Sequence, residues 1–155
     1  LGLKAISESP YLKQLETLKL WKNEISDDSI ELMVVSGNFT HLKILMLNDN
    51  LITPAGAAML ASTSLFPQLL TLNLFSNDIG DGGALAFASS KNFSSLELLY
   101  LGENKITDQG AVTLIESQYF PRLKVLDLAM NPLGEASMLA AFKVNNKGKL
   151  QIVYR

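Results

Sequence analysis

The sequence contains no cysteine, and only one of its 155 residues is a histidine, His41. Without cysteine the chain can form no disulfide, no cysteine-ligated zinc site and no thiolate nucleophile. His41 has no second histidine with which to complete a metal site or an acid–base pair, so we expect it to be a solvated turn residue. These absences exclude several large classes of enzymes and zinc-binding modules.

Long apolar runs and an excess of charge of one sign are also missing. No stretch approaches the ~18 consecutive apolar residues of a membrane helix, so we expect no membrane span. Thirteen basic and 15 acidic residues leave a formal charge of −2, which does not favour a nucleic-acid partner. Apolar residues make up 48% of the chain, and leucine is the most frequent residue type. This composition indicates a folded chain with its own core.

Sequence motifs for several kinds of chemistry are absent as well. There is no G-x-x-x-x-G-K-S/T loop, no HExxH helix and no G-x-S-x-G elbow. The glycines of IGDGG, Gly80, Gly82 and Gly83, suggest a phosphate loop at first sight, but the equivalent segments ITPAG and ITDQG indicate a turn shared by several repeats. We therefore predict that the chain is not an enzyme and has no catalytic residue, metal site or cofactor.

The dominant feature is a repeat of constant length. Asparagine recurs at one fixed interval, and so does a leucine ahead of it, as in Leu15 and Asn23 followed by Leu42 and Asn50. The pattern L-x-x-L-x-L-x-x-N-x-I/L fills five units without insertion or deletion. We divide the chain into a half repeat 1–14, full repeats 15–41, 42–68, 69–95, 96–122 and 123–149, and a final strand 150–155. These units form one predicted domain, 1–155. Because the first residue is not Met and the chain opens inside a half repeat, we expect a piece of a larger protein.

Each unit changes its hydrophobic period once. Leucines alternate at its start, as in Leu18 and Leu20, which predicts a short strand with one buried face. After the asparagine, apolar residues recur at i, i+3 and i+4, as in Ile30, Met33 and Val34, which predicts a helix. Strands spaced by about 4.8 Å must stack opposite helices that need roughly 8–10 Å. The stack therefore bends into an arc with a concave parallel sheet and convex helices.

The starts of the helices are marked as well. Ser26, Thr53 and Thr107 stand where a hydroxyl can cap the first turn of a helix. Glycines such as Gly83 recur in the same turn, which predicts a close approach of neighbouring helices.

The motif L-x-x-L-x-L-x-x-N, followed by I-T/G/S-D/P-x-G, resembles the leucine-rich repeat family in its long helical, ribonuclease-inhibitor-like form, over nearly the whole chain. The resemblance implies an α/β fold, a right-handed solenoid. Because unrelated proteins use this fold, it implies little about function. Its similarity to Ran GTPase-activating repeats raises a regulator of that type as an alternative, and a substrate-recognition segment of a larger ubiquitin-ligase-type enzyme or effector is another.

The recurring asparagines are better explained by structure than by ligand binding. An amide side chain at this point can pair both its oxygen and its nitrogen with backbone groups of the turn that leaves the strand. We therefore expect a structural asparagine ladder: Asn23, Asn50, Asn77, Asn104 and Asn131.

Charges are predicted to separate between the two edges of the arc. Acidic residues such as Asp27, Asp81 and Asp108 fall between strand and helix, and basic residues such as Lys91 and Arg122 follow the helices. One explanation is that the two rims bind different partners. The simpler one is that each end of the parallel helix dipoles attracts its counter-charge.

The concave face is the predicted binding surface. Residues that alternate with the buried leucines point to this open side of the sheet. They include aromatic side chains of the kinds that dominate binding interfaces, although a flanking domain could cover the same face. Met130 is expected to extend the apolar part of this surface. The predicted partner-binding residues are Lys19, Trp21, Ile44, Met46, Asn48, Asn73, Phe75, Leu98, Tyr100, Asp127 and Tyr154.

The sequence therefore predicts a protein–protein recognition module whose partner is another protein. Self-association through an uncapped N-terminal end, where Leu3 and Ile6 would be exposed, is a further expectation. Because the repeats lack cysteine and insertions, we expect a cytoplasmic protein, or a bacterial protein delivered into a host cytosol.

Overall fold

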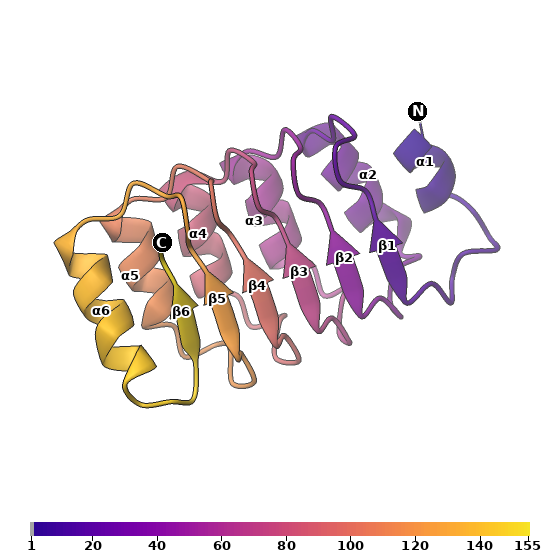
Figure 1. Ribbon diagram of the computed structural model, residues 1–155. Helices are drawn as coiled ribbons and strands as arrows, with labels where there is room; N and C mark the ends of the chain where they lie inside the picture. The colour runs from indigo at the N-terminus through magenta and orange to yellow at the C-terminus, as the bar shows by residue number, and fades with distance from the viewer. Residues whose placement is uncertain (1) are drawn as a thin grey trace.

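Residues 2–155, which the computed structural model describes, form six parallel strands that alternate with six helices. The strands lie side by side in chain order and the helices cover one face of the sheet (Figure 1). The chain climbs each strand, passes over to the helix layer and returns, which gives a right-handed solenoid with a concave sheet. The elements are α1 (Gly2–Ser7), β1 (Thr17–Lys19), α2 (Asp27–Ser36), β2 (Ile44–Met46), α3 (Pro54–Ser62), β3 (Thr71–Asn73), α4 (Gly80–Ala88), β4 (Leu98–Tyr100), α5 (Asp108–Ile115), β5 (Val125–Asp127), α6 (Glu135–Asn145) and β6 (Gln151–Val153).

The core lies between the sheet and the helix layer. Leu45, Leu72 and Leu99, the central residues of three strands, are buried, and so are apolar residues of the helices such as Phe87. The phenylalanines that precede the strands close the layer as an internal column. They are Phe39, Phe66, Phe93 and Phe120. Each repeat therefore buries its apolar face only by stacking on its neighbours.

The four asparagines Asn50, Asn77, Asn104 and Asn131 bond the backbone of the loop between strand and helix. Asn50 Oδ1 accepts from the backbone N–H groups of Asn23 and Ile25, both at 3.0 Å, and its Nδ2 donates to the carbonyls of Leu20 and Leu47. Each of the four thus ties its own loop to the preceding repeat. Asn23 is exposed, and among the described residues its side chain bonds only the Trp21 carbonyl, to which Nδ2 donates at 2.8 Å.

The residue before each of these asparagines has a left-handed backbone. Lys22, Asp49, Ser76, Glu103 and Met130 have φ between 52° and 60°, and none is glycine. Left-handed backbone is costly for residues that carry a Cβ. The strain is held in place by the amide bonds of the next residue, so it recurs with the period of the repeat.

Carboxylates link successive helices at their N-terminal ends. Asp81 accepts from the Thr107 N–H, the Thr107 hydroxyl and the Gly110 N–H, at 2.8, 2.6 and 3.1 Å. Asp27 and Asp108 make the corresponding contacts with Thr53 and with Gly134 and Ser137. The sequence explains these acids by the helix dipole or by partner binding at the rim, and it does not reveal their link to the next repeat.

The predicted hydroxyl caps are confirmed in part. Thr53 accepts from the Ala55 N–H and Thr107 from the Gln109 N–H. The predicted capping bond of Ser26 is wrong, because its hydroxyl makes no such bond.

Glycines in the first helical turns permit close approach of neighbouring repeats, as predicted. A Cβ on Gly83 would lie 2.8 Å from the Cβ of Ala57 in the preceding helix. At the N-terminal end, Leu3 and Ile6 are partly buried and pack against the core, so the prediction that they are exposed is wrong.

Candidate interaction surface

The concave face is built from residues that flank the buried leucines. Register pairing aligns one row along the middle of the sheet: Lys19, Met46, Asn73, Tyr100 and Asp127. A second row, one pleat nearer the strand starts, contains Thr17, Ile44, Thr71, Leu98 and Val125. Because adjacent parallel strands lie about 4.8 Å apart, each row forms a continuous line of side chains.

A third row continues beyond the strand ends. Backbone bonds from Lys22 to the Asn48 carbonyl, from Asp49 to the Phe75 carbonyl and from Ser76 to the Gly102 carbonyl keep the chains paired there. This row contains Trp21, Asn48, Phe75, Gly102 and Ala129. Trp21 is half exposed, at 50%.

Three aromatic side chains lie on this face, and none of them belongs to the core of residues 2–155: Trp21, Phe75 and Tyr100. Phe75 packs against Gly102, a neighbour without a side chain. A Cβ on Gly102 would lie 2.5 Å from Phe75 Cε2 and 2.9 Å from the Ala129 carbonyl oxygen. The ring therefore packs against Gly102, where no larger residue would fit without a shift of Phe75.

Polar residues of the same face are fixed by their own backbone. Asn73 Oδ1 accepts from the Phe75 N–H and Asp127 Oδ1 accepts from the Ala129 N–H, each at 2.9 Å. Asn48 Nδ2 donates to Asp49 Oδ2 at 2.7 Å, while its Oδ1 is shielded from solvent and has no partner among the described residues. These short-range bonds reduce the rotamer freedom that binding would otherwise remove.

The predicted place of Tyr154 on this face is wrong. Strand β6 pairs with β5 as Leu126↔Ile152 and Asp127↔Val153, whereas the constant spacing of the other strands would pair Asp127 with Tyr154. Ile152 is therefore buried, and Tyr154 packs against the core. The chain is one residue shorter between these strands, and Asn145 fixes the new register through bonds to both the N–H and the carbonyl of Ile152. The change of register is not visible in the sequence, because Leu150 follows Leu123 at the normal repeat spacing.

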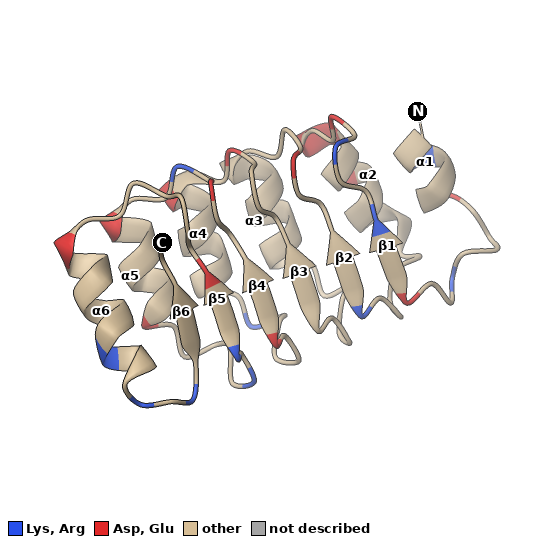
Figure 2. Ribbon diagram, in the orientation of Figure 1, with Lys and Arg blue, Asp and Glu red and all other residues tan. Residues whose placement is uncertain are grey.

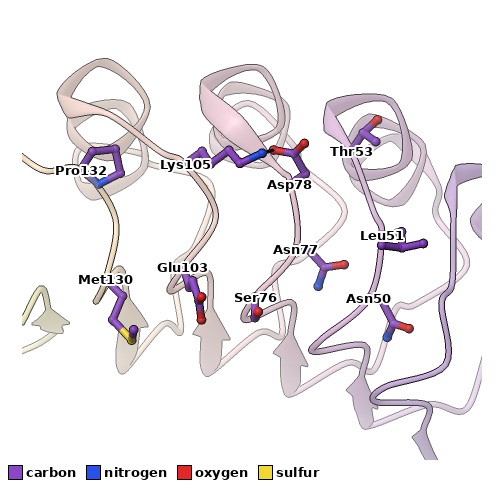
Figure 3. Close-up of a pocket in the computed structure, with 10 residues that line it drawn as sticks. All are labelled: Asn50, Leu51, Thr53, Ser76, Asn77, Asp78, Glu103, Lys105, Met130 and Pro132. Atoms are coloured by element: carbon purple, nitrogen blue, oxygen red, sulfur yellow. Dashed lines mark ion pairs between the residues drawn. The ribbon is translucent and has the colours of Figure 1, made fainter.

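Met130, which the sequence also suggests for this surface, lies on the loop between β5 and α6 and is 68% exposed. It lines a groove at the edge of the sheet together with residues of three other loops (Figure 3).

Nine of the 15 carboxylates lie in the five strand-to-helix loops or in the first turns of the helices that follow them. Figure 2 shows mostly acidic residues along the edge where strands pass to helices, whereas the opposite edge carries both signs, including the ion pairs Lys43–Glu16 and Lys124–Glu97. Asp108 is the group whose environment is most clearly altered. The hydrogen bond from Ser137, followed by that from the Gly134 N–H, lowers the pKa of Asp108 below its ordinary value. This carboxylate stabilises the start of α6.

Residues 2–155 contain no group of three or more histidine, aspartate or glutamate side chains placed to hold a metal ion. Over the same residues, no helix is long and apolar enough to cross a membrane.

A family model described as Leucine Rich repeat matches residues 40–61, 67–88 and 94–114. The three matches follow one another at the period of the repeat and coincide with three successive strand–helix units of the solenoid. The chain belongs to the leucine-rich repeat family. Leucine-rich repeats generally mediate protein–protein interaction. A search of curated proteins found no match to the chain.

Proposed function

We propose that this leucine-rich repeat chain is a non-catalytic recognition module that binds a partner protein on its concave face. The observation that carries the proposal is the position of Trp21, Phe75 and Tyr100 on one surface of the sheet, outside the core. Tryptophan and tyrosine contribute disproportionately to binding energy because they combine a large apolar area with a polar group.

The shape of the surface supports the same proposal. Ile44, Met46 and Leu98 are half-buried between the aromatic residues, so the centre of the face is apolar. Lys19 and Asp127 lie at opposite ends of the middle row. A partner with an apolar centre and charges of opposite sign at its two ends fits this arrangement.

Site-specific photo-crosslinking tests the proposal. A benzoylphenylalanine residue placed at Tyr100 should crosslink one specific protein in an extract of the source organism. The same residue placed at Leu85, which is exposed on α4, should not crosslink it. In the Tyr100 variant, the further substitutions Trp21→Ala and Phe75→Ala should abolish the crosslink while circular dichroism and melting stay close to those of the parent. A crosslink of equal yield from both positions, or one that survives the further substitutions, contradicts the proposal.

Self-association through the N-terminal end is a separate proposal with its own support. A pocket of about 300 Å³ lies between α1 and the first repeat, lined by Gly2, Leu3, Ile6 and Leu20 among others, and β1 is an edge strand of the sheet. Light scattering over a concentration series should show a dimer that the substitution Leu20→Lys weakens. A constant monomer mass at all concentrations contradicts it.

A further inference from the structure

Four consecutive strand-to-helix loops form a shallow groove outside the concave face. Its volume is about 600 Å³. The groove is lined by Asn50, Leu51, Thr53, Ser76, Asn77, Asp78, Glu103, Lys105, Met130 and Pro132 (Figure 3). It crosses the loops that follow β2, β3, β4 and β5, so it spans three strand spacings, roughly 14 Å.

The two ends of the groove are apolar. Leu51 is 58% exposed at one end, and Met130, beside Pro132, is 68% exposed at the other (Figure 3). Because Leu51 and Met130 line the same groove, one ligand can contact the exposed apolar surface of both. The amide groups of Asn50 and Asn77 are engaged with backbone, so they add no recognition chemistry to the floor.

The middle of the groove is acidic. Glu103 forms no ion pair among the described residues, and Asp78 is held by Lys105 at 2.8 Å. Both partners of this pair are more than half exposed, so the bond contributes little and can be exchanged. Ser76, Glu103 and Met130 all have left-handed backbone, so their side chains leave the three loops in equivalent geometry and form a row.

The surrounding charge has the same sign. Along the edge that contains the groove, counted over the loops and the first helical turns of residues 2–155, nine carboxylates oppose two lysines. The carboxylates are Glu24, Asp27, Asp28, Asp49, Asp78, Asp81, Glu103, Asp108 and Glu135, and the lysines are Lys22 and Lys105. Helix dipoles account for the acids of the first turns only, because their effect is short-ranged. Asp49 and Glu103 each stand four residues ahead of the N-cap of the next helix, outside that range.

We propose that this groove binds an extended peptide segment of a partner protein with a basic residue at its centre and an apolar residue two positions away on each side. In an extended chain, alternate side chains point the same way and residues i and i+4 lie about 13–14 Å apart. That distance matches the span of the groove. The basic side chain reaches Glu103 and Asp78, displacing Lys105, and the apolar side chains cover Leu51 and Met130.

The test is an NMR titration of the isotope-labelled chain with an acetylated and amidated pentapeptide, Leu-Ser-Arg-Ser-Leu. Backbone amides of Ser76, Asp78, Glu103 and Met130 should shift with saturation, while that of Tyr100 on the concave face stays in place. Leu-Ser-Glu-Ser-Leu should bind at least threefold more weakly, because its charge is repelled.

Matched variants separate the groove from general electrostatic attraction. Glu103→Gln should weaken Leu-Ser-Arg-Ser-Leu binding about threefold, whereas Lys105→Gln should strengthen it about threefold by freeing Asp78. Lys22→Gln removes the same charge as Lys105→Gln on the same edge but outside the groove, so it should increase the affinity for the peptide less. Leu51→Ala should weaken binding by about threefold.

Any of several outcomes overturns the proposal: no saturable shift, shifts that map elsewhere, equal binding of the glutamate peptide, or equal effects of Lys22→Gln and Lys105→Gln. Phe75→Ala should leave the pentapeptide titration unchanged. The groove and the concave face can thus fail or succeed independently.

Discussion

The ring of Phe75 packs against Gly102 of the following repeat. A Cβ atom added to Gly102 would lie only 2.5 Å from Phe75 Cε2. Phe75 is therefore held against the sheet, and its exposed edge faces outward at a fixed place. A rigid aromatic residue loses little entropy on binding.

Gly102→Ala should displace Phe75 and lower the free energy of unfolding by about 1–3 kcal/mol, because the added methyl group would clash with the Phe75 ring. Gly2→Ala is the matched control, since a Cβ there would contact nothing within 4 Å, and it should change stability by less than about 0.5 kcal/mol. Urea denaturation measures both. The α protons of Gly102 should also shift downfield in Phe75→Leu, when the ring current is removed. Equal stability of the two glycine variants would contradict the packing of Phe75 on Gly102.

Asn104 and Asn23 occupy the same position of two repeats but differ in burial, so they test the role of the asparagine ladder. The Asn104 side chain is fully buried and bonds the backbone of neighbouring repeats, whereas the Asn23 side chain is exposed and makes one bond among the described residues. Asn104→Ala should destabilise the chain by about 1–3 kcal/mol, because it leaves buried backbone groups unpaired. Asn23→Ala should cost less than about 0.5 kcal/mol. Equal losses in denaturant unfolding would show that burial does not set the contribution of these amides.

The strand register at the C-terminal end can be tested with neighbouring residues. Ile152→Ala should cost about 2–4 kcal/mol, because Ile152 lies in the core. Val153→Ala should cost less than about 1 kcal/mol, because Val153 lies in the outward row opposite Asp127. A repeat of strictly constant length predicts the reverse order, so the two melting curves decide the register.

The hydrogen bonds of Asp108 make the stability of the chain depend on pH. They lower the pKa of Asp108 in the folded state below its unfolded value. The resulting stabilisation is therefore present above the unfolded pKa and is lost as the pH falls through the folded pKa. Ser137→Ala should raise the pKa of Asp108, which carbon-13 NMR of the carboxyl group measures. Ser89→Ala, a change at an exposed serine distant in sequence, should leave it unaltered. An unchanged Asp108 titration in Ser137→Ala contradicts this account.

The fold could be predicted from sequence because its determinants repeat. Each leucine of the strands and each asparagine of the loops recurs at the same spacing, so this constant period determines the strand order and the buried face. The family was identified from the same residues. The cytosolic location and the repeat boundaries stay predictions, and the sequence does not identify the partner.

The errors arose where one contact overrides the repeat. The last unit is one residue shorter between β5 and β6, and Asn145 fixes the resulting register by bonding Ile152, so that Tyr154 packs against the core. The role of Asp81 and Asp108 in joining helices depends on distances between repeats that spacing along the chain does not reveal.

The groove at Glu103 and Met130 could not be predicted either, because it consists of residues from four loops. A signal is nevertheless present in the sequence, since Met130 is an apolar residue at a loop position where the other repeats carry polar residues.

The left-handed residues ahead of the asparagine ladder also limit how the loops can diverge. Lys22, Asp49, Ser76, Glu103 and Met130 differ in size and charge, yet none is β-branched, and β-branched residues are the least compatible with positive φ. A combinatorial library built on this scaffold can therefore vary charge and length freely at these five sites. Members carrying valine, isoleucine or threonine there should be depleted when the library is selected for folded protein.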